Sequence, residues 1–231
     1  MPKLNDFKHF HTKNSKKEGK HSSLEVTPLA KKVLLLLFVV FLLLFPHYAP
    51  WESDRTQDNT ILGQIFMLYF FIANQTLGII HESGHGVCYI LPCPEFFMVL
   101  NGTLFQLLFP AGIAYYYKRK GNRFAMYVAL FFVGFSLHYT AWYISTAHEG
   151  LILPASKSFL GVDAYHDFNY LLTAMGLMQY ESFIAGLTRF MAYLIMVVAV
   201  IGMFFGAFTH SDKRKEKGEK NLKTVSRSPL K

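Results

Sequence analysis

Charged residues are scarce in this sequence of 231 residues. They make up 16% of the chain, whereas soluble domains carry about 25%. That shortage excludes an ordinary water-soluble basic protein. The hydrophobic share of 52% excludes a disordered protein as well, because disordered chains are polar. The composition is therefore that of a chain solvated largely by lipid.

The formal net charge of +8 is confined to the two ends of the sequence. Residues 1–32 hold eight Lys against three acids, and residues 211–231 hold eight Lys or Arg against three acids. The 178 residues between them hold seven basic and nine acidic residues. The basic charge is thus not spread over a folded domain as a nucleic-acid-binding surface would be, and we expect no nucleic-acid partner. It is typical of tails that lie against an anionic membrane surface.

Long apolar runs predict an all-α, multipass membrane protein. The first run, VLLLLFVVFLLLF, is followed by no small-residue cleavage site, so we expect an uncleaved anchor rather than a signal peptide. The predicted spans cover residues 29–45, 61–80, 96–117, 124–147 and 183–209. A shorter apolar stretch at 168–180 could be a half-span or a tilted helix. The sequence therefore predicts five to six membrane segments in a domain over 29–209. It also predicts disordered basic tails at 1–28 and 210–231.

One basic cluster at 118–123 conflicts with a simple alternation of spans. If both tails lie in the cytosol, alternation places this cluster outside, against the positive-inside rule. Residues 92–110 contain three prolines and an Asn-Gly pair. Either 92–110 is a re-entrant stretch, which brings the cluster back to the cytosolic side, or the positive-inside bias is locally broken. The prolines and the Asn-Gly pair favour the re-entrant stretch.

A short motif, HESGH at residues 81–85, carries the strongest chemical signal. Residues four apart share one face of a helix, so His81 and His85 can hold one metal ion with Glu82 beside them. This is the HExxH arrangement, in which two histidines bind zinc and the glutamate accepts a proton from the activated water. Ionisable residues within a span are costly and functional by default. We therefore predict Zn²⁺ bound by His81 and His85, with Glu82 as the catalytic base.

Zinc needs a third protein ligand, and several downstream residues could supply it. The candidates are His138, His148, Glu149, Asp163, His166 and Asp167. His138 lies in an aromatic run typical of a packed helix, and His148 with Glu149 is expected to be solvated. Asp167 is the preferred ligand, although a carboxylate at the start of an apolar helix could cap that helix instead. His166 could be another metal contact, a partner of a ligand or an oxyanion donor.

Other polar residues near the motif have two interpretations each. Asn101 and Gln106 could hydrogen-bond a substrate carbonyl or oxyanion, or could satisfy the backbone near Pro110. Cys88 and Cys93 could bind metal, but thiolates would close a site that needs an open position, so we expect reduced, structural cysteines. The aromatic residues at 51, 115–117 and 142–143 are expected at membrane interfaces.

In their order along the chain, these motifs resemble the site-2 protease family of intramembrane zinc metalloproteases, in particular its small bacterial branch. The resemblance covers residues 61–209 and rests on HESGH, Gln106 with Pro110, and a late histidine–aspartate–aromatic motif at 166–168. The family's Leu-Asp-Gly motif is absent, and GVDA at 161–164 matches it poorly. The resemblance implies a zinc cofactor and hydrolysis of a peptide bond in or near the membrane. Its substrate would be a transmembrane or juxtamembrane segment of a protein.

Two other functions use the same residues. The chain could be a zinc-dependent membrane amidase or lipid hydrolase, or a catalytically silent membrane protein that keeps the metal helix. The expected location is a bacterial inner membrane, with both termini in the cytosol. Counting from Ile61 at the outer surface, His81 lies about 30 Å deep, near the inner face.

Overall fold

The chain folds almost entirely into helices. The computed structural model describes residues 27–48, 60–155 and 162–225, with the backbone alone for Tyr48, Phe70 and residues 209–225. Its long helices are α1 (Pro28–Tyr48), α2 (Ile61–Ile90), α3 (Glu95–Arg119), α4 (Arg123–Ser145) and α6 (Glu181–Val225). All five contain a stretch long and apolar enough to cross a membrane. The prediction of an all-α, multipass membrane protein is thereby confirmed.

Short elements connect α4 to α6. After the 3₁₀ helix η2 (Ala147–Glu149), strand β1 (Ile152–Leu153) pairs antiparallel with β2 (Ala164–Tyr165). The short helix α5 (Asp167–Ala174) follows, and then the 3₁₀ helix η3 (Met178–Tyr180). The β1–β2 ladder closes the loop after α4, and the backbone N–H of His166 donates to Leu151 O at 2.8 Å. The start of α5 is therefore held beside the end of α4.

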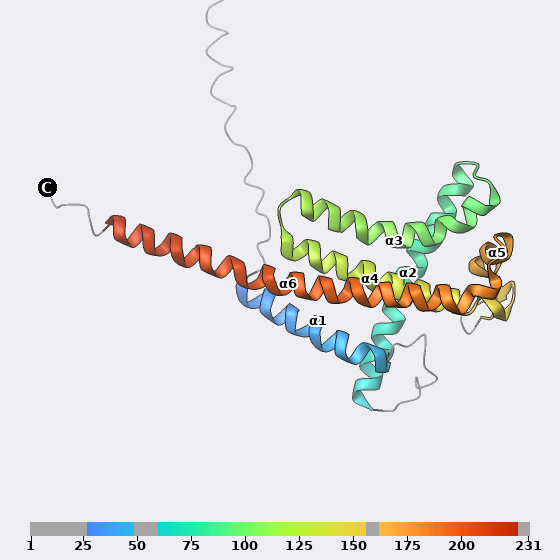
Figure 1. Ribbon diagram of the computed structural model, residues 1–231, viewed down its shortest axis with the longest axis horizontal. Coiled ribbons are helices and arrows are strands. Elements are labelled where there is room, and N and C mark those ends of the chain that lie inside the picture. Colours follow the sequence, from blue (N-terminus) through green and yellow to red (C-terminus); the bar gives the residue numbers. More distant parts are fainter. Residues whose placement is uncertain (1–26, 49–59, 156–161, 226–231) are drawn as a thin grey trace, which may run out of the picture.

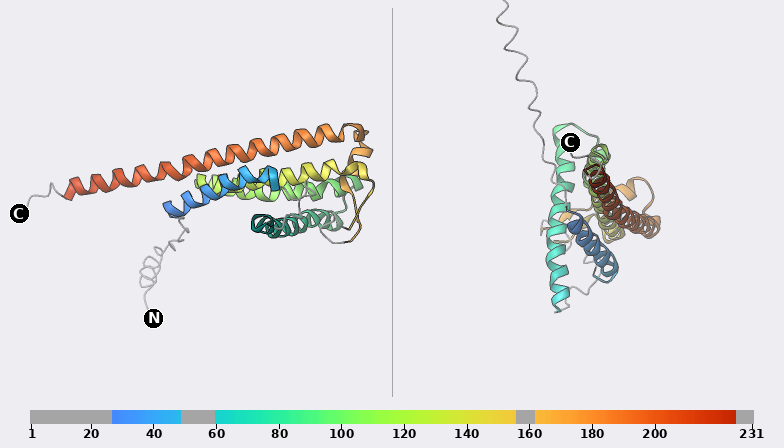
Figure 2. Two further views of the ribbon diagram at one scale, coloured as in Figure 1. Left: turned by 90° about the horizontal axis from the view of Figure 1, so that it is seen from below. Right: turned by 90° about the vertical axis from the view of Figure 1, so that its left-hand side faces the viewer.

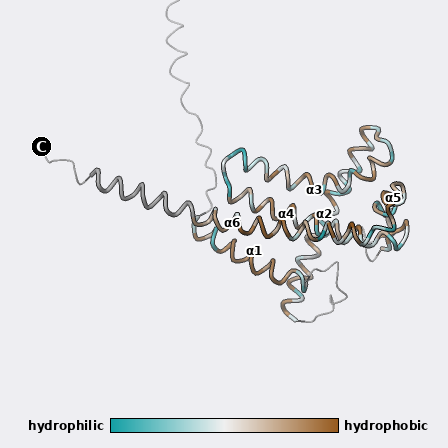
Figure 3. Tube along the Cα trace, viewed as in Figure 1, coloured by the Kyte–Doolittle hydropathy of each residue, from teal (hydrophilic) through white to brown (hydrophobic). Residues whose placement is uncertain are grey.

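Helices α1, α3, α4 and α6 run roughly along the long axis of the molecule, whereas α2 crosses them steeply (Figures 1 and 2). The α4–α6 contact is close because Gly134 has no side chain. A Cβ at that position would lie 2.7 Å from Met196 Cγ. Small residues at helix contacts are typical of membrane bundles. The hydropathy is brown along the middle of the helices and teal at the α3–α4 turn and around α5 (Figure 3). Polar residues thus gather at the two ends of an apolar bundle.

The predicted re-entrant stretch at 92–110 is wrong, because α3 is one continuous helix from Glu95 to Arg119. Pro110 is accommodated inside the helix. A proline leaves the carbonyl four residues earlier without its helical partner. In α3 this carbonyl belongs to Gln106, and it accepts a hydrogen bond from Ser136 Oγ of α4 at 3.1 Å. A neighbouring helix therefore replaces the bond that the proline removes, and the chain does not need to turn back.

Two other segments differ from the sequence prediction. The apolar stretch at 168–180 does not form one helix, since α5 ends at Ala174 after eight residues and the 3₁₀ helix η3 covers Met178–Tyr180. The C-terminal tail from residue 210 is not disordered as far as Val225, because α6 continues to that residue. Its Lys- and Glu-rich sequence consists largely of good helix formers. The predicted N-terminal tail at 1–28 lies almost wholly outside the described residues.

Candidate metal centre

Three side chains from distant parts of the sequence meet at one point. The atom Asp167 Oδ2 lies 2.7 Å from His81 Nε2 and 3.2 Å from His85 Nε2. Among the described residues, these three form a cluster of ligand atoms that all lie within 4.8 Å of one another. All three side chains are largely shielded by the protein, with exposed side-chain fractions of 10%, 14% and 7% for His81, His85 and Asp167. The cluster brings together the three predicted metal ligands.

The donor set fits a zinc ion. Ligand atoms of a tetrahedral zinc site lie about 3.3 Å apart, because each bond is about 2.0 Å long. The His85–Asp167 separation of 3.2 Å already has this value. The His81–Asp167 separation of 2.7 Å is that of a hydrogen bond. The carboxylate oxygen would move by only a few tenths of an ångström if a metal ion replaced the shared proton. Two imidazoles and one carboxylate are also ligands that zinc accepts with a position left open.

Each imidazole is oriented by a hydrogen bond to its other nitrogen. His85 Nδ1 donates to Met98 O at 2.8 Å, and His81 Nδ1 lies 3.3 Å from Gln106 Oε1. Because Nδ1 carries the proton in both bonds, both Nε2 atoms can face a metal. Such partners fix the tautomer and orientation of metal ligands. Both partners lie on α3, which therefore aligns the metal helix α2.

Gln106 is held by α4 so that its oxygen faces His81. Its side-chain Nε2 donates to Ser136 O at 3.3 Å and to Ser136 Oγ at 3.2 Å. These acceptors fix the amide orientation, since only the NH₂ group can donate to them. Gln106 is 1% exposed, so it orients the His81 ring and has no surface open to a substrate. Asn101 is also engaged, because its Nδ2 donates to Gly84 O at 2.6 Å and ties α3 to α2.

Asp167 reaches the histidines because the end of α4 holds the start of α5. The Tyr143 hydroxyl accepts a hydrogen bond from the backbone N–H of Asp167 at 3.1 Å. The Tyr143 ring stacks on His166, with ring centroids 4.5 Å apart. Asn169 Nδ2 donates to Ala147 O at 2.8 Å, which adds a third contact between the two segments. Together these contacts place the Asp167 side chain over α2.

His166 is a helix cap in this structure. Its Nδ1 accepts from the backbone N–H of Asn169 at 3.4 Å, at the N-cap of α5. The Thr146 hydroxyl donates to Tyr143 O at 2.9 Å. The same hydroxyl oxygen lies 3.1 Å from His166 Nε2, so it accepts a hydrogen bond from Nε2–H. Burial lowers the pKa of His166, although nearby carboxylates such as Asp167 oppose this. A neutral imidazole with both nitrogens engaged has no lone pair left for zinc.

The Asp167 carboxylate is held in its ionised form. Burial by itself raises the pKa of this group, but hydrogen bonds from His81 and His85 outweigh it, and the pKa lies below its usual value. A metal ligand must be deprotonated to bind. Asp167 therefore meets this condition before any metal arrives.

The other candidate ligands lie apart from the cluster. The exposed Asp163 accepts a hydrogen bond from Ala155 N–H at 2.8 Å. His148 Nδ1 forms a pair with Glu181 at 2.9 Å. The buried His138 packs against the rings of Phe45 and Tyr193, as its aromatic surroundings in the sequence indicate. None of them belongs to the group of three ligand atoms described above.

The predicted catalytic base, Glu82, is on an exposed face of α2 next to the metal ligands. Ser83 is exposed beside it. A carboxylate turned toward hydrocarbon would be costly. This face of α2 is therefore expected to meet water, which would give water a route to the cluster.

A glycine lets α3 approach the imidazoles. A Cβ on Gly102 would lie 2.7 Å from His81 Nε2 and 2.5 Å from His85 Nε2. Real Cβ atoms essentially never approach other atoms within 3.0 Å. Any side chain at this position would therefore displace the two nitrogens that face the candidate metal position.

Gly102→Ala is expected to weaken zinc binding about 5- to 150-fold, because overpacking of this kind costs about 1–3 kcal/mol. Zinc affinity of the purified protein, measured by competition with a chromophoric chelator, checks this value. The matched control is Gly86→Ala, also near the motif, where a Cβ would meet nothing within 4 Å. Equal affinities of the two variants would contradict the role assigned to Gly102.

Cys88 and Cys93 form a disulfide, so the prediction of reduced cysteines is wrong. Helix α2 ends at Ile90, and the chain turns between Pro92 and Pro94 before α3 begins. This turn brings the two Cα atoms to 5.2 Å, which is within the range that a disulfide spans. The disulfide joins the end of the metal helix to the start of α3.

Sequence reasoning missed the residues that support the ligands. Tyr143 was assigned to the membrane interface with Trp142, yet it is 9% exposed and contacts both Asp167 and His166. Ser136 and Gly102 carried no signal of their own. Only the spacing of Pro110 four residues after Gln106 could have indicated a carbonyl that needs a partner.

No known protein family, curated protein or solved structure matches this chain.

Proposed function

We propose that this chain is a membrane-embedded zinc metallopeptidase of the HExxH type that hydrolyses a peptide bond in or near the membrane. The observation that carries the proposal is the meeting of His81, His85 and Asp167 beside an exposed Glu82. The order of these motifs along the chain, which resembles that of site-2 proteases, also supports it. A purely structural cluster would not need a free carboxylate next to two imidazoles.

Each residue has a defined role in this function. His81, His85 and Asp167 would hold the zinc, which would polarise a carbonyl and lower the pKa of water to about 7. Glu82 accepts the proton of the attacking water and returns it to the leaving amine. Gln106 and the Met98 carbonyl keep the imidazoles in place. Tyr143 keeps the Asp167 backbone in place.

The expected substrate is a stretch of protein chain without helical structure at the cleavage point. A helix uses its carbonyls in its own hydrogen bonds, so a transmembrane helix would have to unwind locally before attack. A juxtamembrane segment without helical structure already has carbonyls that are free for attack. Both kinds of segment come from proteins that share the membrane with this chain.

Removal and return of the metal test this function. The full chain, purified into lipid vesicles, is mixed with the membrane-protein fraction of the expression host, and new N-termini are identified by mass spectrometry. We expect new N-termini that disappear with 1,10-phenanthroline and return when zinc is added back, because the metal supplies the activation of water. Cleavage that is unaffected by the chelator would contradict the proposal. Release of fatty acids in place of new N-termini would favour a lipid hydrolase.

A further inference from the structure

Basic side chains gather at one end of the bundle. Lys31 and Lys32 lie in the first turn of α1, and residues 118–123 at the α3–α4 turn add four more. Two contacts bring α1 beside the start of α4 and beside residue 208 of α6. Lys31 Nζ lies 5.8 Å from the centre of the Phe124 ring, and Lys32 Nζ lies 5.2 Å from that of Phe208. We call this end, defined by Lys31, Lys32 and residues 118–123, the basic end.

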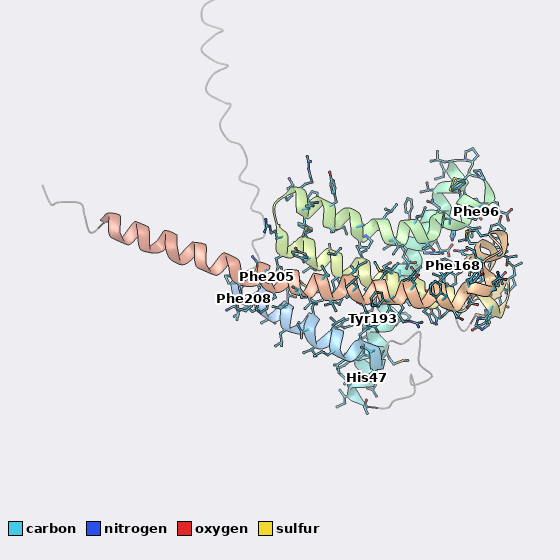
Figure 4. All side chains as sticks on the ribbon, in the orientation of Figure 1. His47, Phe96, Phe168, Tyr193, Phe205 and Phe208 are labelled. Carbon is cyan, nitrogen blue, oxygen red and sulfur yellow. A yellow bond between two sulfur atoms is a disulfide. The ribbon has the colours of Figure 1, made fainter. Side chains whose placement is uncertain are left out.

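The acidic side chains show the opposite distribution. The six in the part of the chain whose side chains are described all belong to the metal site or to segments around it: Glu82, Glu95, Glu149, Asp163, Asp167 and Glu181. No acid occurs at 27–48 or 111–130, the segments that form the basic end. Phe96 and Phe168, which neighbour Glu95 and Asp167, lie at the end of the bundle far from Phe205 and Phe208 (Figure 4). The bundle therefore has a basic end and a site end.

The Cys88–Cys93 disulfide lies at the site end. Cys93 is three residues before Phe96, and the bond joins the last turn of α2 to the start of α3. Disulfides persist in oxidising compartments and are rare in the reducing cytosol. Lys and Arg, by contrast, accumulate on the cytosolic side of membrane proteins. These two independent signals assign opposite sides of the membrane to the two ends of the bundle.

The steep crossing of α2 makes this arrangement consistent with the order of the helices. Helices α3, α4 and α6 run between the two ends of the bundle, and α1 runs beside them from the basic end, whereas α2 crosses them steeply and does not return to the basic end (Figures 1 and 2). The contacts of Lys31 with Phe124 and of Lys32 with Phe208 place the start of α1, the α3–α4 turn and residue 208 of α6 at the same end. The basic cluster at 118–123 then obeys the positive-inside rule without a re-entrant stretch.

We propose that the basic end lies against the anionic cytosolic leaflet and that the metal centre opens on the opposite, oxidising side of the membrane. The estimate from the sequence placed His81 near the inner face because it assumed that α2 stands perpendicular to the membrane. In the structure, α2 crosses the other helices steeply, so this estimate does not apply. If the chain has the proposed peptidase function, on which this step rests, the placement also defines the class of its substrates. The substrates are membrane-protein segments just outside the cytosolic compartment.

Single introduced cysteines test the placement in cells. In a Cys88→Ser/Cys93→Ser background, Thr173→Cys marks the site end and Lys120→Cys marks the basic end, and both positions are exposed. With a membrane-impermeant maleimide, we expect Thr173→Cys to be labelled in intact cells and Lys120→Cys only after permeabilisation. The reverse pattern, or equal labelling of both positions in intact cells, overturns the proposal.

The native cysteines provide a second readout that needs no substitution. In the unaltered chain, Cys88 and Cys93 should resist alkylation in cells until a reductant is added, because a disulfide has no free thiol. Free thiols at both positions would overturn the placement even if the background variant failed to fold. Neither readout depends on zinc or turnover, and a Glu82→Gln chain should label identically. Failure of the peptidase proposal is therefore distinguishable from failure of the placement.

Discussion

Asp167→Ala is expected to reduce the zinc content of the purified protein from about one ion per chain toward zero, because two imidazoles alone leave zinc short of a protein ligand. The Asp167 carboxylate oxygen lies 2.7 Å from His81 Nε2 and 3.2 Å from His85 Nε2. Zinc-dependent turnover should fall together with the zinc content. Atomic emission spectrometry of the dialysed protein measures the metal directly.

Asp163→Ala is the matched control for this experiment. It removes the same side chain four residues earlier, and it also removes a hydrogen bond, the one accepted from Ala155 N–H. This variant should keep its zinc, since Asp163 lies outside the cluster. Loss of zinc in Asp163→Ala but not in Asp167→Ala would move the third ligand upstream. Asp167→Asn, which preserves the size of the side chain without its charge, separates metal loss from misfolding.

Glu82→Gln is expected to reduce turnover about 100- to 10,000-fold while zinc content stays unchanged, because general acid–base catalysis contributes about this factor. The amide has the size of the carboxylate but cannot accept the proton of water. Because Glu82 is exposed and lies outside the group of ligand atoms, the substitution should leave the metal in place. Initial rates of appearance of new N-termini, divided by zinc content, give the comparison.

Glu95→Gln serves as its control, because Glu95 is another exposed glutamate in the same part of the structure. Its rate should match that of the unaltered chain. Full activity of Glu82→Gln at full zinc content would show that Glu82 is not the catalytic base. A loss of zinc in this variant would instead assign Glu82 to the metal.

The helical spans and the common face of His81 and His85 could be predicted from the sequence alone, for a physical reason. An apolar run of about 20 residues has few stable alternatives to a helix in lipid. The spacing of His81 and His85 fixes their common face through helix geometry alone. Both inferences depend on local sequence, and neither requires knowledge of how the helices pack.

The rest of the site depends on contacts between distant segments. Asp167, and not Asp163, lies beside the two histidines because His166 caps α5 and the Tyr143 hydroxyl binds the backbone N–H of Asp167. Gln106 became a partner of His81 because Ser136 of α4 fixes its amide. The re-entrant prediction failed because a hydroxyl on another helix satisfies the carbonyl that Pro110 leaves free. Local sequence contains none of these pairings.

The separation of 86 residues between His81 and Asp167 has a thermodynamic consequence. Zinc at this position would close a chain loop of that length through two side chains, and the unfolded chain has no preformed site to compete for the ion. Binding free energy then adds to the free energy of folding. Apart from the ion, the α5 segment is held by its hydrogen bonds to Tyr143 and Ala147 and by burial of Phe168, Leu171 and Leu172 in an apolar cluster. The metal would thus act as a reversible cross-link between α2 and α5 that adds to these contacts.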